Sequence, residues 1–142
     1  MKEIHDSDLN FIRAHAILKA FFLNEEEGGN MSEETWYYDV VGVTFEGRQQ
    51  ILNDFYKNYK VGHAYGVNLV PEDANPYDAN AVAVQLEVRP GQYEMVGYLS
   101  GKNSDNIIAR ELMPKMRKAA LGTIGPTRKG DIGLNINVTY DK

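Results

Sequence analysis

Cysteine and long apolar runs are both missing from this sequence. The 142 residues include no cysteine, which excludes disulfides, cysteine-ligated zinc and thiol nucleophiles and is typical of a reducing compartment. No apolar run reaches the about 18 residues that a membrane-spanning helix needs. The first residues, Met1 to Asp6, carry charge where a signal peptide would be apolar. These absences predict a cytoplasmic protein with no membrane partner.

An excess of positive charge is missing too, but the acidic residues are concentrated at one end. The formal net charge is −5, and residues 1–39 alone hold three basic against nine acidic residues. Residues 102–129 show the reverse balance, with seven basic and two acidic residues. This basic stripe is either a surface that attracts a polyanion or the solvated face of a helix, and charge alone does not decide between them.

The first 33 residues form a predicted unit of their own. Residues 8–24 are expected to form a helix that is apolar around much of its circumference. Its apolar positions are Leu9, Phe11, Ile12, Ala16, Leu18, Ala20, Phe22 and Leu23. Such a helix packs against its own domain, a second copy or a partner protein. The acidic, glycine-containing run that begins at Asn24 ends it and predicts a linker before the main domain, residues 34–142.

The main domain alternates between strand and helix patterns. The expected elements are a strand over 36–45, a helix over 47–59, a strand over 67–70, a hairpin of strands over 81–88 and 92–99, a helix from Ser104 to about Ala120, and a strand over 134–140. Ser104 is the expected cap of the second helix, Pro114 kinks or splits it, and Gly122 ends it. This order predicts a mainly β, α+β domain or barrel with flanking helices.

Two motifs that bind cofactors in other proteins are incomplete here. Gly97 to Asn103 has one residue too few for a phosphate loop and lacks the Ser or Thr that would hold Mg²⁺. The polar residues between Glu72 and Asn80 are interrupted by Pro76-Tyr77, so they do not follow a calcium loop. We therefore predict no cofactor, no metal and no catalytic residue.

The turn Asn75-Pro76-Tyr77-Asp78 is the most informative part of the sequence. Asn and Asp bond their own backbone in turns and Pro fixes φ, so turn chemistry explains three of the four residues. It does not explain a large aromatic residue at Tyr77. A ring of this kind can stack on a nucleic-acid base, while the neighbouring carboxylate accepts a hydrogen bond from a sugar hydroxyl.

Three ordered motifs within residues 38–140 carry a family resemblance. They are the run from Val40 to Gln50, the block Asn75-Pro76-Tyr77-Asp78-Ala79-Asn80-Ala81-Val82-Ala83-Val84, and Val96-Gly97-Tyr98-Leu99. Together they resemble the HIRAN domain. The resemblance implies a small OB-like or SH3-like β-barrel, here with an N-terminal helical arm. In eukaryotes this domain precedes DNA translocases that remodel stalled replication forks, and it grips the 3′ end of single-stranded DNA.

The resemblance also implies roles for individual residues. Tyr77 would stack on a terminal base, Asp78 would contact the terminal hydroxyl, and Tyr98 would line the same pocket. Arg48 and Lys102 would hold phosphates, and Asn75 completes the predicted nucleic-acid-binding set. One departure concerns the stretch Tyr38-Asp39-Val40, where the helicase-attached members have Arg-Tyr-Tyr.

Structural roles for the same residues stay open at this stage. Tyr77 can cover the core, Asp78 can cap its own turn, Tyr98 can point inward, and Arg48 can pair with Glu46. The predicted function is a non-catalytic module that binds single-stranded DNA ends.

Two alternatives to this function remain. One is a protein-interaction or dimerisation module that works through helix 8–24, and the other is a metal-dependent nuclease that uses Asp73 and Asp78. A further hypothesis is that the acidic arm, residues 1–39, folds over residues 102–129 and competes with DNA.

Overall fold

The structure is a computed structural model that describes residues 32–142. The predicted helix over 8–24, its suggested role in dimerisation and the linker after it lie outside the described residues. No helix within residues 32–142 combines the length and the apolar character needed to cross a bilayer.

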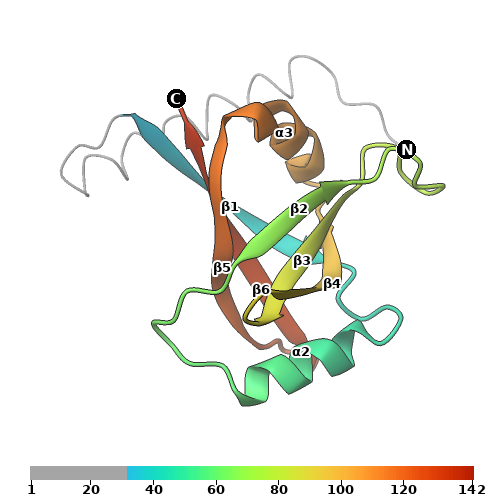
Figure 1. Cartoon of the computed structure of the whole chain (residues 1–142). Helices are drawn as coiled ribbons and strands as arrows, with labels where there is room; N and C mark the ends of the chain where they lie inside the picture. Colours follow the sequence, from blue (N-terminus) through green and yellow to red (C-terminus); the bar gives the residue numbers. More distant parts are fainter. Residues whose placement is uncertain (1–31) are drawn as a thin grey trace.

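The described residues form one antiparallel sheet and two α-helices (Figure 1). The elements are β1 (Glu33–Val41), α2 (Arg48–Lys57), β2 (Val67–Pro71), β3 (Val82–Arg89), β4 (Gln92–Leu99), α3 (Asp105–Leu112), the 3-10 turn η1 (Met113–Lys115), β5 (Met116–Pro126) and β6 (Ile132–Asp141). The six strands are arranged in the order β2-β3-β4-β1-β6-β5. The mainly β, α+β class is therefore confirmed, as are the predicted hairpin and the predicted last strand.

The sheet is strongly curled but does not close. Its edge strands β2 and β5 approach each other at one end, where a single bridge joins Gly66 to Ala120. The amide of Leu121 donates to the carbonyl of Tyr65 at 2.9 Å next to this bridge. Helices α2 and α3 lie at opposite ends of the sheet (Figure 1).

The core fills the concave side of the sheet. Strand β6 alternates strictly, with every second residue from Ile132 to Tyr140 buried, as the apolar pattern predicts. The hydroxyls of Tyr38 and Tyr140 share a buried hydrogen bond of 3.0 Å. Burial raises the pKa of both phenols, and that of Tyr140 reaches about 12. Both phenols therefore stay protonated and serve as a polar pair inside an apolar core.

Strands β1 and β4 approach closely at Gly97. A Cβ added there would lie 2.5 Å from the carbonyl oxygen of Val41 and 2.6 Å from Cγ1 of Val40. The Val-Gly-Tyr-Leu motif thus contains glycine because β1 occupies the space of a side chain.

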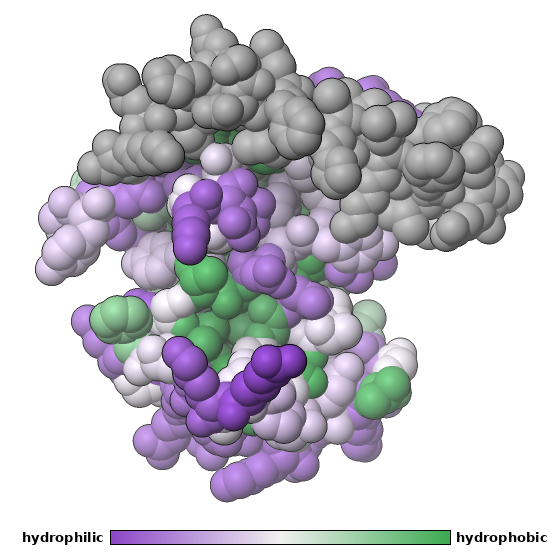
Figure 2. Space-filling view, turned by 180° about the vertical axis from the view of Figure 1, so that it is seen from behind, coloured by the Kyte–Doolittle hydropathy of each residue, from purple (hydrophilic) through white to green (hydrophobic). Residues whose placement is uncertain are grey.

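Hydrophobic residues also reach the surface in the middle of the rear face, surrounded by hydrophilic ones (Figure 2).

The prediction of a long second helix is wrong. Helix α3 ends at Leu112, Pro114 lies in η1, and the following residues form β5. The ring of Pro114 stops the helix, and β6 then supplies a hydrogen-bonding partner along residues 116–126. Ser104 precedes α3 but makes no side-chain cap and has a left-handed backbone with φ of 64°. The predicted strand over 36–45 also ends early, at Val41, because Gly42 turns the chain with φ of 70°.

Candidate binding site

The loop between β2 and β3 is fixed by its own side chains. The Oδ1 atom of Asn75 accepts hydrogen bonds from the amides of Tyr77 and Asp78 at 2.9 and 3.1 Å. The Oδ1 atom of Asp78 accepts one from the amide of Asn80 at 2.8 Å. The amide of Glu72 donates across the base of the loop to the carbonyl of residue 81 at 2.9 Å. The predicted turn chemistry of Asn75 and Asp78 is confirmed.

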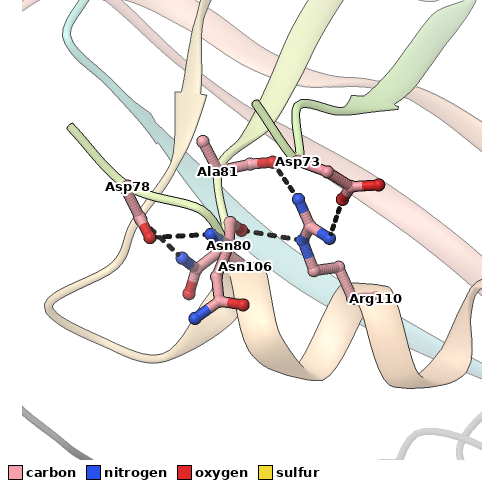
Figure 3. Close-up of polar contacts among 6 residues, drawn as sticks. All are labelled: Asp73, Asp78, Asn80, Ala81, Asn106 and Arg110. Carbon is pink, nitrogen blue, oxygen red and sulfur yellow. Dashed lines mark hydrogen bonds and ion pairs between the residues drawn. The ribbon is translucent and has the colours of Figure 1, made fainter. Parts of the chain in front are cut away.

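Helix α3 holds the same loop from below through Asn106. This side chain is 2% exposed, and its Nδ2 atom donates to Oδ2 of Asp78 at 3.1 Å (Figure 3). Each carboxylate oxygen of Asp78 therefore accepts one hydrogen bond, one from the loop and one from the helix. The orientation of this carboxylate is set before any ligand arrives.

Arg110, one turn further along α3, makes three contacts with the loop (Figure 3). Its Nε atom donates to the carbonyl of Asn80 at 2.9 Å, and one terminal nitrogen donates to the carbonyl of Ala81 at 2.8 Å. The other terminal nitrogen forms an ion pair of 2.6 Å with Asp73, whose side chain is 84% exposed. The planar guanidinium thus spans both ends of the loop.

Tyr77 stands at the tip of this braced loop and is 93% exposed. It does not cover the core, so the structural role considered for it is wrong. A large ring normally loses water-exposed area on folding, and this ring does not. The fold therefore presents an aromatic face to solvent on a backbone that is already ordered.

Tyr98 and Arg48 adjoin the loop through Glu72. The hydroxyl of Tyr98 donates to Oε1 of Glu72 at 2.8 Å, and Nδ2 of Asn75 donates to the same oxygen at 3.0 Å. The guanidinium carbon of Arg48 lies 5.3 Å from the centre of the Tyr98 ring and 5.8 Å from that of Phe45. Partial burial is the main cause that raises the pKa of Tyr98, and the hydrogen bond to Glu72 is the second.

Arg48 is held by the turn that follows β1. One terminal nitrogen donates to the carbonyl of Gly42 at 2.6 Å, and a Cβ at Gly42 would lie 3.2 Å from that nitrogen. Within residues 32–142 Arg48 makes no ion pair with Glu46, so that structural alternative is wrong. Its positive charge instead lies over two aromatic rings.

Lys102 lies beside this set without direct contact to it. The residue before it, Gly101, passes so close to the loop that a Cβ there would lie 3.6 Å from Oδ2 of Asp78. Lys102 itself is exposed and makes no ion pair within the described part of the chain. The structure thus brings five of the six predicted residues into one connected set, namely Arg48, Asn75, Tyr77, Asp78 and Tyr98, and places the sixth next to it.

The carboxylates that a nuclease would need do not converge. Asp73 pairs with Arg110 and Asp78 with Asn106. The residues that the structure describes contain no group of three or more His, Asp or Glu side chains arranged to hold a metal ion. Geometry gives the nuclease alternative no support.

A second carboxylate pair lies at the other side of α3. Burial and, to a lesser extent, the nearby charge of Asp39 together raise the pKa of Asp105 to about 7. Asp39 is the residue that departs from the family pattern, and its negative charge falls next to α3 rather than on the loop that carries Tyr77.

Three residues of the site were not expected from the sequence. Glu72, Asn106 and Arg110 position the predicted residues, although none of them belongs to the three motifs that carry the family resemblance. One signal was available: Asn106 and Arg110 are four residues apart on a predicted helix, which places them on one face.

The comparisons with known proteins add no relative. No family model, no curated protein and no solved structure matches this chain. The HIRAN resemblance therefore stays a prediction that rests on the three motifs.

Proposed function

We propose that this chain is a non-catalytic module that binds the 3′ end of single-stranded DNA on the surface around Tyr77 and Asp78. The observation that carries the proposal is the 93% exposure of Tyr77 on a loop fixed from within and from α3. Stacking of one base on such a ring contributes roughly 1–3 kcal/mol. Little of this is lost to ordering the loop, because the loop is already ordered.

Asp78 supplies the end selectivity in this proposal. An ionised carboxylate can accept about four hydrogen bonds, and that of Asp78 accepts two within the protein. The remaining lone pairs can accept a hydrogen bond from a terminal 3′-hydroxyl. A terminal phosphate carries negative charge and would be repelled at the same place.

Arg48 and Lys102 supply the positive charge that a phosphate backbone requires. Arg48 uses one terminal nitrogen for Gly42, which leaves its other donors for a phosphate oxygen. Two phosphate contacts and one or two stacked bases, less the cost of association, correspond to a dissociation constant of about 1 μM. The acidic net charge of the chain opposes tighter binding.

An OB-like or SH3-like barrel is part of the same proposal. The curled sheet and the single bridge between Gly66 and Ala120 support it, because a barrel requires the edge strands to meet. In this arrangement the loop that carries Tyr77 lies at the same end of the sheet as α3, which braces it.

The test is fluorescence anisotropy with two short single strands of identical sequence, one ending in a 3′-hydroxyl and one in a 3′-phosphate. The native protein should bind the hydroxyl strand more tightly, and Asp78→Asn should abolish the difference. Tyr77→Ala should weaken binding to both strands about tenfold. Tyr93→Ala is the matched control, because Tyr93 is an exposed tyrosine at the other end of β4 and should leave binding unchanged.

Two outcomes would contradict the proposal. Equal affinity for both strands, unaffected by Asp78→Asn, would remove the end selectivity. Absence of binding at low salt, where phosphate contacts are strongest, would exclude nucleic acid as the ligand. It would favour the alternative of a protein-interaction module.

A further inference from the structure

A mainly apolar groove of about 390 Å³ lies on the far side of α3 from the candidate site. Trp36 of β1 and Ile108 and Leu112 of α3 contribute its apolar walls, and two acidic and two basic residues complete its lining: Glu34, Glu111, Lys115 and Lys142. On a helix, Asn106 and Arg110 share one face, whereas Ile108 and Leu112 project to the opposite face. Helix α3 thus contacts the loop of the candidate site on one side and lines the groove on the other.

The indole of Trp36 marks this groove as incomplete. Its Nε1 atom is buried and has no hydrogen-bond partner within residues 32–142. Buried donors in native proteins are nearly always paired, and an unpaired one costs about 1–3 kcal/mol. An unpaired donor beside an apolar groove fits a partner segment that brings both apolar side chains and a hydrogen-bond acceptor.

We infer that the groove is the docking site for residues 8–24 of the same chain. The chain enters β1 at Glu33, and Glu34 and Trp36 already line the groove. The described part of the chain therefore begins beside the groove. A helix over residues 8–24 would be about 25 Å long, and the eight residues after it can span up to about 27 Å, so the helix can fold back.

The sequence of this segment fits the groove. Leu9, Ile12 and Leu23 give the predicted helix an apolar face, and the alanines at 16 and 20 on the same face allow close approach to a flat indole ring. Docking here leaves Tyr77 and Asp78 uncovered, unlike an arm that folds over the whole basic stripe.

Trp36 offers a direct test because it is the only tryptophan in the chain. In the ¹⁵N-labelled full-length protein its indole N–H gives one resonance. The double variant Ile12→Asp, Leu23→Asp should shift this resonance and speed its exchange with solvent. Asn10→Asp, Asn24→Asp is the matched control, since it adds two carboxylates at polar positions of the same segment and should leave the resonance unchanged.

Two results would overturn the inference. An indole resonance that responds equally to both double variants, or to neither, would show that the apolar face of residues 8–24 does not cover Trp36. Recovery of the native resonance when the labelled Ile12→Asp, Leu23→Asp chain is mixed with unlabelled native chain would show that the covering segment comes from a second copy. A native resonance that is independent of protein concentration supports docking within one chain.

Discussion

Arg110→Ala tests whether α3 fixes the loop that carries Tyr77. The variant removes two hydrogen bonds from a guanidinium to backbone carbonyls and one ion pair to Asp73. Hydrogen bonds to charged groups contribute roughly 1.5–3 kcal/mol each. The carbonyl of Ala81 keeps a second partner, the amide of Glu72, and the freed side chain regains entropy. We therefore expect Arg110→Ala to lower the free energy of unfolding by about 2–3 kcal/mol.

The ion pair should account for little of this effect. The side chain of Asp73 is 84% exposed, and exposed ion pairs contribute about 0–1 kcal/mol. Asp73→Asn should therefore cost less than about 1 kcal/mol and should lose that small effect in high salt. Arg110→Ala should stay destabilising at any ionic strength, because the bonds to carbonyls persist when charges are screened.

Urea denaturation followed by the fluorescence of Trp36 measures both variants. The denaturation midpoint should fall for Arg110→Ala with an unchanged slope, which identifies a change in stability rather than in the surface exposed on unfolding. The reasoning is refuted if Asp73→Asn costs as much as Arg110→Ala. In that case the exposed ion pair, and not the pair of carbonyl contacts, would brace the loop.

Three further perturbations follow from the fold. Gly97→Ala forces a Cβ against β1 and should cost about 3 kcal/mol in urea denaturation. Burial and the charge of Asp39 raise the pKa of Asp105 from 3.8 to about 7. The folded state therefore holds this proton more tightly than the unfolded state. The free energy of unfolding should fall as pH rises from about 4 to 7. Asp105→Asn should flatten this pH dependence of the urea midpoint. Tyr38→Phe leaves the buried Tyr140 hydroxyl unpaired and should lower the free energy of unfolding by about 1–3 kcal/mol. In a double-mutant cycle, changing both tyrosines to phenylalanine should cost less than the sum of the two single changes.

Each of these has an outcome that contradicts it. Gly125→Ala is the control for Gly97→Ala, since Gly125 also lies in a strand and a Cβ there would have only the Tyr56 hydroxyl nearby, at 3.9 Å; equal costs would rule out steric overlap as the cause. Stability that rises between pH 4 and 7 in the native protein but not in Asp105→Asn would reverse the assigned shift. Strict additivity of the two tyrosine variants would show that their hydroxyls do not depend on each other.

Local patterns predicted those parts of the fold in which neighbours in sequence decide the structure. The alternation from Leu134 to Tyr140 predicted β6 because one face of that strand is buried along its whole length. Residues 116–121 have good helix formers such as Met, Lys, Ala and Leu, yet they form β5. Hydrogen bonding to β6 overrides that propensity. A single sequence does not reveal that β6 has a free edge to which residues 116–121 can pair.

In the candidate site, too, contacts between sequence neighbours were predictable and contacts between distant residues were not. The turn around Asn75 was predictable because its hydrogen bonds span two or three residues. The contact between Tyr98 and Glu72 joins residues 26 apart, and that between Arg110 and Asp73 joins residues 37 apart. Such contacts depend on how the hairpin and α3 come together, so the motifs named the binding residues but not those that position them.

The pairing of β1 with β6 has a mechanical consequence. Glu33 lies opposite Asp141, and the amide of residue 142 donates to the carbonyl of Ser32 at 3.1 Å. A force applied at these two points would open the ladder one rung at a time, like a zipper, rather than shearing all its hydrogen bonds together. The same proximity makes the domain suitable for grafting into a surface loop of a host protein, because the host would need to bridge only the width of one strand pair.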